Sequence, residues 1–253
     1  MLRRLGMLFI SMLFIGILPI LNFAQDVPAK PAETANPVVL IIIVGALALA
    51  PFGLIMLTSF VKIAVVLSIL RNALGTQQVP PNQVITGIAL ILTVFIMSPV
   101  AEKMYAEAGT IQNTEAIFSE VSVKTLFEAS QRGKEPLRQF LMRYADERHR
   151  VMFFNLAQRM AQKNGNDPNT ISVDEFRVII PAFVTSQLTE AFQIGFILFV
   201  PFLIIDMVVA NILQAMGMFM LSPTIISLPF KLLLFVLING WELLIKNLVL
   251  GYI

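Results

Sequence analysis

Five ionisable side chains stand inside segments that are otherwise apolar, and they are the first candidates for chemistry in this sequence. They are Lys62, Glu190, Asp206, Lys231 and Glu242. A charged side chain at a lipid-exposed helix centre costs about 2.5 to 3.5 kcal/mol on insertion scales, so each of them implies a partner or water nearby. Residues of this kind serve in ion-coupled transport, in proton relays or in ion pairs that hold helices together.

Asp206 and Lys231 flank the connection formed by residues 211–229, one on each arm. If the arms pack antiparallel, the two side chains could reach one another or the equivalent residues of neighbouring copies. The functional interpretation is a latch between subunits, and the alternative is an ordinary structural ion pair. A proton relay through Asp206 is a third interpretation, which is weakened because no further carboxylate or histidine lies in line with it.

The connection itself carries no charge and holds three methionines within five positions, Met216, Met218 and Met220. This spacing does not place them on one helix face, so a helix core explains them poorly. Thioethers can bind Cu(I), but no Cys or His lies near them. Flexible methionines from several copies arranged in a ring could instead seal a pore and deform around a variable substrate. That interpretation also accounts for the missing charge and for Gly217.

The residues of a catalytic or metal centre are not apparent. The chain has no cysteine, and its one histidine, His149, stands in the charged run 146–150, where a lone residue is rarely a base or a ligand. Residues 164–171 resemble a calcium loop only in passing, because Pro168 replaces a ligand and Asn169 stands where glycine is required. We therefore expect no enzyme activity, no cofactor and no bound metal.

Composition indicates a membrane protein. Hydrophobic residues make up 57% of the 253 positions and charged residues only 13%, far from the values of a soluble domain. The formal net charge is +2, and no basic run is interleaved with aromatic residues. We therefore expect a membrane as a partner and no nucleic acid.

The pattern along the chain predicts an all-α, integral membrane-type subunit with four long apolar helical segments, kinked or broken into hairpins, and a helical periplasmic insert. The insert holds 11 of the 16 acids and 11 of the 18 bases. The predicted order is a signal peptide at 1–24, a linker at 25–37, a first apolar helical pair at 38–100, the soluble insert at 101–181, and a second apolar helical pair with the Met-rich hairpin at 182–253.

Local signals predict some helix ends. Pro51 favours a kink or break in the segment 38–57. Arg71 followed by Gly75 predicts a helix C-terminus, and Ser172 with Glu175 fits a capping box that starts a helix. With the mature N-terminus and the insert in the periplasm, the hairpin 211–229 should be cytoplasmic, yet it lacks the Lys and Arg that the positive-inside rule expects.

Several stretches together resemble the FliP/SctR family of type III secretion export-gate proteins. Each is weak alone, but their order and combination are specific, and they span nearly all of the chain beyond the linker. The stretches are LRNALG (70–75), PPNQ (80–83), FIMSP (95–99), PAFVTSQL (181–188), AFQIGF (191–196), PFLIID (201–206) and LPFK (228–231).

The resemblance implies an all-helical subunit of the bacterial inner membrane, within the secretion or flagellar basal body. It implies assembly with other copies of itself, two sister membrane proteins and larger export-gate and basal-body components. Unfolded secreted substrates would pass through the axis of this assembly. The resemblance also implies that the apolar helices pack against sister subunits and need not each span lipid. This would explain the missing positive-inside signal.

For the site residues, the resemblance maps a gasket of consecutive methionines onto Met218, Phe219 and Met220, with Phe219 as a departure from the family pattern. The expected pore constriction is therefore the run Met216, Gly217, Met218, Phe219 and Met220. The expected charges for assembly are Lys62, Glu190, Asp206 and Lys231.

Two features bear on which branch of the family applies. Residues 60–63 and 137–158 look closer to the injectisome branch, whereas an N-terminal signal is more usual in the flagellar one.

The main alternative function is a small ion-coupled secondary transporter that uses Asp206 and Glu190, which would require an internal repeat that is not visible. A third hypothesis is a membrane anchor for a periplasmic binding domain at 101–181.

Overall fold

The computed structural model describes residues 55–76, 79–108 and 133–253, with some positions between 41 and 53. These described residues form helices and contain no strand. The chain divides into residues 1–47 and 48–253, and every element considered below lies in the second unit. The expected signal peptide, the linker and the kink at Pro51 fall outside the described residues.

The first helical pair consists of α3 (Phe60–Leu74) and α4 (Asn82–Ala108), which pack against each other. As the sequence predicts, α3 ends with Arg71 in its last turn and Gly75 as its cap. Gly75 has a φ of 74°, and its N–H donates to the carbonyl of Asn72 at 3.1 Å. Glycine adopts this left-handed conformation without a steric penalty, so the helix stops there.

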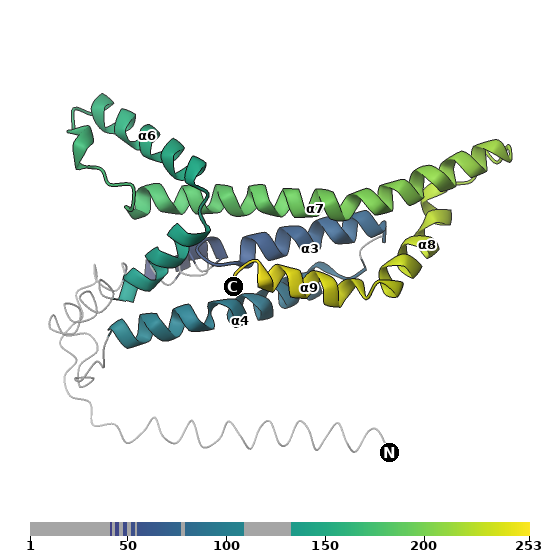
Figure 1. Cartoon of the computed structure of the whole chain (residues 1–253), viewed down its shortest axis with the longest axis horizontal. Helices are drawn as coiled ribbons and strands as arrows, with labels where there is room; N and C mark the ends of the chain where they lie inside the picture. Colours follow the sequence, from purple (N-terminus) through teal and green to yellow (C-terminus); the bar gives the residue numbers. More distant parts are fainter. Residues whose placement is uncertain are drawn as a thin grey trace, which may run out of the picture. The chain divides into compact units, whose positions relative to one another are not determined.

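The described part of the insert is helical. A helix covers residues 133–144, α6 spans Glu147–Lys163, and a 3₁₀ turn, η1, spans Pro168–Thr170. Asp146 caps α6, because its carboxylate accepts the backbone N–H of Arg148 at 2.8 Å. Helix α6 then lies against the first half of α7 (Figure 1).

Helix α7 (Phe176–Ala215) is 40 residues long and continues through Pro181 and Pro201. The expected boundary between the insert and the second apolar pair, after residue 181, therefore lies inside one helix. Half of the expected capping box is present, since Glu175 Oε1 accepts the N–H of Ser172 at 3.1 Å. The Ser172 hydroxyl bonds Asp174 instead, and the helix begins only at Phe176.

The last apolar segment consists of two helices, within the expectation of kinked or broken segments, although the sequence did not place this break. Helix α8 (Pro223–Leu237) and helix α9 (Gly240–Leu250) meet at a bend of 60°. Asn239 has a φ of 50° at the break, a conformation that Asn tolerates better than most residues. A Cβ on Gly240 would lie 2.2 Å from the Phe235 ring, so the bend also needs a glycine beside it.

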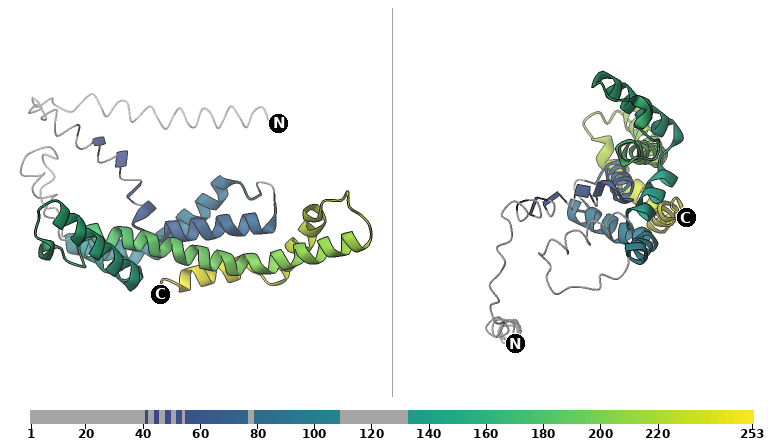
Figure 2. Two further views of the ribbon diagram at one scale, coloured as in Figure 1. Left: turned by 90° about the horizontal axis from the view of Figure 1, so that it is seen from above. Right: turned by 90° about the vertical axis from the view of Figure 1, so that its left-hand side faces the viewer.

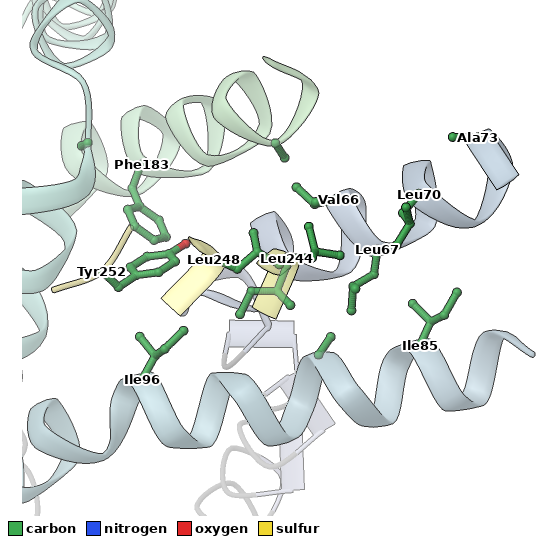
Figure 3. Close-up of a cluster of buried hydrophobic side chains, with 14 of the residues drawn as sticks. Val66, Leu67, Leu70, Ala73, Ile85, Ile96, Phe183, Leu244, Leu248 and Tyr252 are labelled. Atoms are coloured by element: carbon green, nitrogen blue, oxygen red, sulfur yellow. The ribbon is translucent and has the colours of Figure 1, made fainter. Parts of the chain in front are cut away.

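The core forms where α3 is surrounded by α4, α7 and α9 (Figure 3). Helices α3 and α7 approach so closely that a Cβ on Gly195 would lie 2.4 Å from the Ile69 side chain. The buried residues include Ile63, Val66, Leu67 and Leu70 of α3, Ile85, Ala89 and Ile96 of α4, Ile179, Phe183 and Ala191 of α7, and Leu244, Leu248 and Tyr252 at the C-terminal end.

By length and composition, α4 and α7 could each cross a membrane, and α8 with α9 could form a third span if the bent pair counts as one. The described residues thus hold two or three such segments. The sequence predicts four, and half of the positions of the first, at 38–57, lie outside the described residues.

Candidate functional site

Residues 216–222 form the connection between α7 and α8, at the end of α7 that lies away from α6 (Figure 2). The N–H of Met218 donates to the carbonyl of Leu213 at 2.9 Å, and the N–H of Gly217 donates to that of Gln214 at 3.0 Å. These two bonds define a Schellman motif, in which Gly217 takes the left-handed conformation with a φ of 73°. Glycine at this position thus sets where α7 ends and how the chain turns.

The side chains of residues 216–221 in this connection are apolar and uncovered. Met220 is fully exposed and Phe219 is 80% exposed, whereas a soluble chain normally places polar residues at such a tip. Met216, Met218 and Leu221 are exposed as well. A charge-free tip of this kind indicates a surface that another chain or an apolar phase covers.

An ion pair joins the two arms beneath the tip. Lys231 Nζ of α8 lies 2.6 Å from Asp206 Oδ2 of α7, and the Ser227 hydroxyl donates to Asp206 Oδ1 at 2.5 Å. Lys231 also donates to the carbonyl of Ala73 at 3.1 Å. That carbonyl belongs to the last turn of α3, where backbone oxygens lack helical partners and the helix dipole favours a cation.

Asp206 and Lys231 therefore form an ion pair within one chain. This arrangement corresponds to the ordinary structural ion pair that was the alternative to a latch between subunits. Together the two residues fix α3, α7 and α8 at one point. Met216, the C-cap of α7, is ten positions after Asp206, which corresponds to about 15 Å at the usual helical rise. The pair thus forms a fixed base from which the apolar tip projects.

A second ion pair lies nearer the start of α7. Lys62 Nζ of α3 is 2.5 Å from Glu190 Oε2 and 4.7 Å from the centroid of the Tyr252 ring. The Tyr252 hydroxyl donates to Gln187 Oε1, and Gln187 Nε2 donates to the carbonyl of Tyr144 at 3.0 Å. Burial raises the pKa of Tyr252 well above its usual value, so this hydroxyl stays neutral and acts as a donor.

Sequence reasoning placed Lys62 and Glu190 among the charges for assembly but did not pair them, and it missed Gln187, Tyr144 and Tyr252 altogether. The available signal was a lysine in the apolar part of α3 and a glutamate in α7, 128 positions apart. Glu242 stands in the first turn of α9, where the helix dipole favours an acid, and it makes no ion pair with another described residue.

His149 has a partner that the sequence did not suggest. Its Nδ1 lies 2.8 Å from Ser186 Oγ, which also accepts the N–H of Asp146 at 2.8 Å. The Ser186 hydroxyl donates to the carbonyl of Ala182 within its own helix. Ser186 is therefore buried and fully used as a structural link between α6 and α7, and it is not an activated nucleophile. Within the described residues, no three His, Cys, Asp or Glu side chains form a metal site.

Comparison with known proteins gives a consistent result. Residues 43–248 match the FliP family. The chain is 45% identical over 224 residues to the flagellar biosynthetic protein FliP of Pectobacterium carotovorum subsp. carotovorum, covering 88% of this chain and 82% of that protein.

Two further relatives do not have a flagellar name. Pathogenicity-related ORF2 of Xanthomonas campestris pv. glycines is 45% identical over 213 residues, covering 84% of this chain and 95% of the relative. The Yop proteins translocation protein R of Yersinia pestis is 44% identical over 214 residues, with the same coverage. These identities are equal within one per cent, so they favour neither the flagellar nor the injectisome branch. With most of its length matched by the family and by these relatives, the chain belongs to the FliP family.

Proposed function

We propose that this chain is a core subunit of the type III protein export gate. In this proposal several copies form, with two sister subunits, the channel through which unfolded substrates leave the cytoplasm, in an injectisome or a flagellum. Membership of the FliP family gives the chain its role in type III secretion, as a membrane component of the export apparatus. The channel itself is inferred from the geometry of the hairpin.

The observation that carries the proposal is the contrast between the base and the tip of this hairpin. The base is fixed by Asp206 and Lys231, whereas Phe219 and Met220 at the tip are almost entirely uncovered. Exposed apolar side chains at such a tip are unfavourable in water. Copies that bring these tips together around an axis would cover them.

A ring of such tips would act as a seal. Apolar constrictions block water and ions by dewetting, without a charged gate. Methionine side chains are flexible and polarizable, so Met218 and Met220 could rearrange around different polypeptides. Phe219 would add a stiffer and bulkier ring to the same constriction.

The outer surface of α7 supplies contacts for such an assembly. Its exposed face is almost wholly apolar along the second half of the helix, which is far more than a monomeric soluble protein leaves uncovered. The exposed residues include Phe196, Ile197, Leu203, Ile204, Met207, Val208 and Ile212. In this proposal they face neighbouring copies, sister subunits or lipid.

Photocrosslinking to a stalled substrate tests the channel. A photoreactive residue replaces Met218 in one variant and Met220 in another, and a control variant carries it at Met160, which is also exposed but lies on α6. The secreted substrate is fused to a domain that cannot unfold, so that it stays in the export path. We expect an adduct with the substrate from position 220 and none from position 160. If positions 218 and 220 both fail to give an adduct with a stalled substrate, the chain does not line the channel.

A further inference from the structure

A cavity of about 280 Å³ lies where the end of α4 meets the helix at 133–144 and Tyr252. It borders the Lys62 ion pair only through the Tyr252 ring, and it is separate from the hairpin. One wall is apolar and belongs to α4, with Ile96, Pro99 and Val100. The helix at 133–144 adds polar side chains, Gln139 and Arg143, beside the apolar Pro136 and Phe140. The cavity therefore suits a ligand that has both polar and apolar groups.

The charge of the lining is positive. Lys103 and Arg143 are its two ionisable cations, and none of its described lining residues is acidic. Lys103 is exposed and forms no ion pair with a described residue. Arg143 uses one N–H, from Nη2, on the carbonyl of Ile253 at 2.9 Å, and its guanidinium has five N–H donors. Both side chains can therefore serve an anionic group, and phosphate matches the fork of an arginine well.

The apolar wall continues along a helix that could span a membrane. Phe95 precedes Pro99 by one turn and is 66% exposed, and Ile91 one turn earlier is 70% exposed. Lysine and arginine near the end of an apolar span typically extend toward the lipid headgroups, and basic pockets at that level bind anionic lipid heads.

We propose that this pocket binds the phosphate headgroup of an anionic phospholipid, whose acyl chains lie along the Phe95 and Ile91 face of α4. Its volume is just below the range of about 300 to 1,000 Å³ that encloses a whole small ligand. It thus holds a headgroup and leaves the acyl chains outside, on α4. The site does not depend on the export channel, because it is built from α4, the insert and the C-terminal residues alone.

Native mass spectrometry of the full chain in a neutral detergent tests the site. The chain is titrated with dioleoyl phosphatidylglycerol, with dioleoyl phosphatidylcholine and with inorganic phosphate. We expect stable adducts with phosphatidylglycerol, few with phosphatidylcholine, and little competition from phosphate. Equal retention of the two lipids would overturn the proposal, and full displacement by inorganic phosphate would show a free-anion site instead.

Charge variants locate the binding. Removing one cation with Lys103→Gln should weaken phosphatidylglycerol binding about fivefold, and K103Q/R143Q should weaken it more than tenfold. The control R159Q/K163Q removes two cations from α6, outside the pocket, and should bind as the unmodified chain does. Because Arg143 also contacts Ile253, the single Lys103 variant decides the result if the double variant does not fold. Unchanged affinity in Lys103→Gln, or an equal loss in the control, would contradict the proposal.

Discussion

The two halves of α7 differ in how completely the chain itself covers them. Most of the buried residues of α7 lie between Val178 and Gly195, against α3 and α6, and only three lie beyond, at Phe202, Val209 and Leu213. The first half is thus part of an ordinary core. The second half carries the apolar tip and is largely uncovered, so we infer that it is completed by other chains.

Each half also holds one ion pair of the same design. In both pairs α7 supplies the acid, Glu190 or Asp206, and a second helix supplies a lysine whose side chain is only 5% exposed. The carboxylates are more open, at 43% for Glu190 and 27% for Asp206. The pairs anchor α7 to α3 and to α8, and the exposed residues 216–221 at the tip lie beyond both of them.

The largest expected effect comes from breaking the base of the hairpin. Asp206→Ala leaves Lys231 buried with only the Ala73 carbonyl, and it should lower the free energy of unfolding by about 3 to 5 kcal/mol. Thermal or denaturant unfolding in detergent measures this. The double variant D206A/K231M removes the stranded charge and should recover most of the loss. A double variant as unstable as Asp206→Ala alone would show that the ion pair is not the cause.

A smaller effect is expected where α7 passes α3. Gly195→Ala places a methyl group 2.4 Å from the Ile69 side chain, so the helices must shift, at about 1 to 3 kcal/mol. The same unfolding assay measures the change. Adding Ile69→Ala makes room and should restore part of the stability. If Gly195→Ala alone proves neutral, the two helices do not approach as closely as described.

The cap of α6, the helix that packs against the first half of α7, should make stability depend on pH. Hydrogen bonds from Arg148 lower the pKa of Asp146 from 3.8 to about 2, so folding favours its charged form. This contribution is complete above the unfolded pKa of 3.8 and is lost as the pH falls toward 2. Asp146→Ala should therefore lower the Tm at pH 7 and lower it by much less near pH 2, where about half of the Asp146 carboxyls are protonated. A Tm difference that stays constant over this pH range would contradict the assignment.

The smallest effect on stability is expected at the tip itself. Met220 is fully exposed, so Met220→Gln should change the free energy of unfolding by less than about 0.5 kcal/mol. In the assembled system the same variant should weaken the seal, measured as increased leakage of ions or small solutes. Loss of stability in the isolated chain would mean that the tip packs within its own subunit.

Local features could be predicted from the sequence, whereas distant pairings could not. Gly75 ends α3, and Gly217 lies in the turn that the charge-free run 211–229 indicated, because glycine and local pattern act within a few residues. The bend at Asn239 was missed, although Asn followed by Gly is a turn signal. Lys62 and Glu190 are 128 positions apart, and nothing in the neighbourhood of Tyr252 marks it as their partner. Such contacts follow only from how α3, α7 and the C-terminal residues pack.

Disulfide crosslinking between copies tests the central claim most directly. The chain has no cysteine, so Met218→Cys and Met220→Cys each introduce a single thiol at the exposed tip. Each variant is oxidised in membranes that contain the whole secretion system, and again in membranes where it is expressed alone. We expect crosslinked copies in the complete system and few in the second sample. Efficient assembly without any crosslink from either position would contradict the convergence of these hairpins on a shared axis.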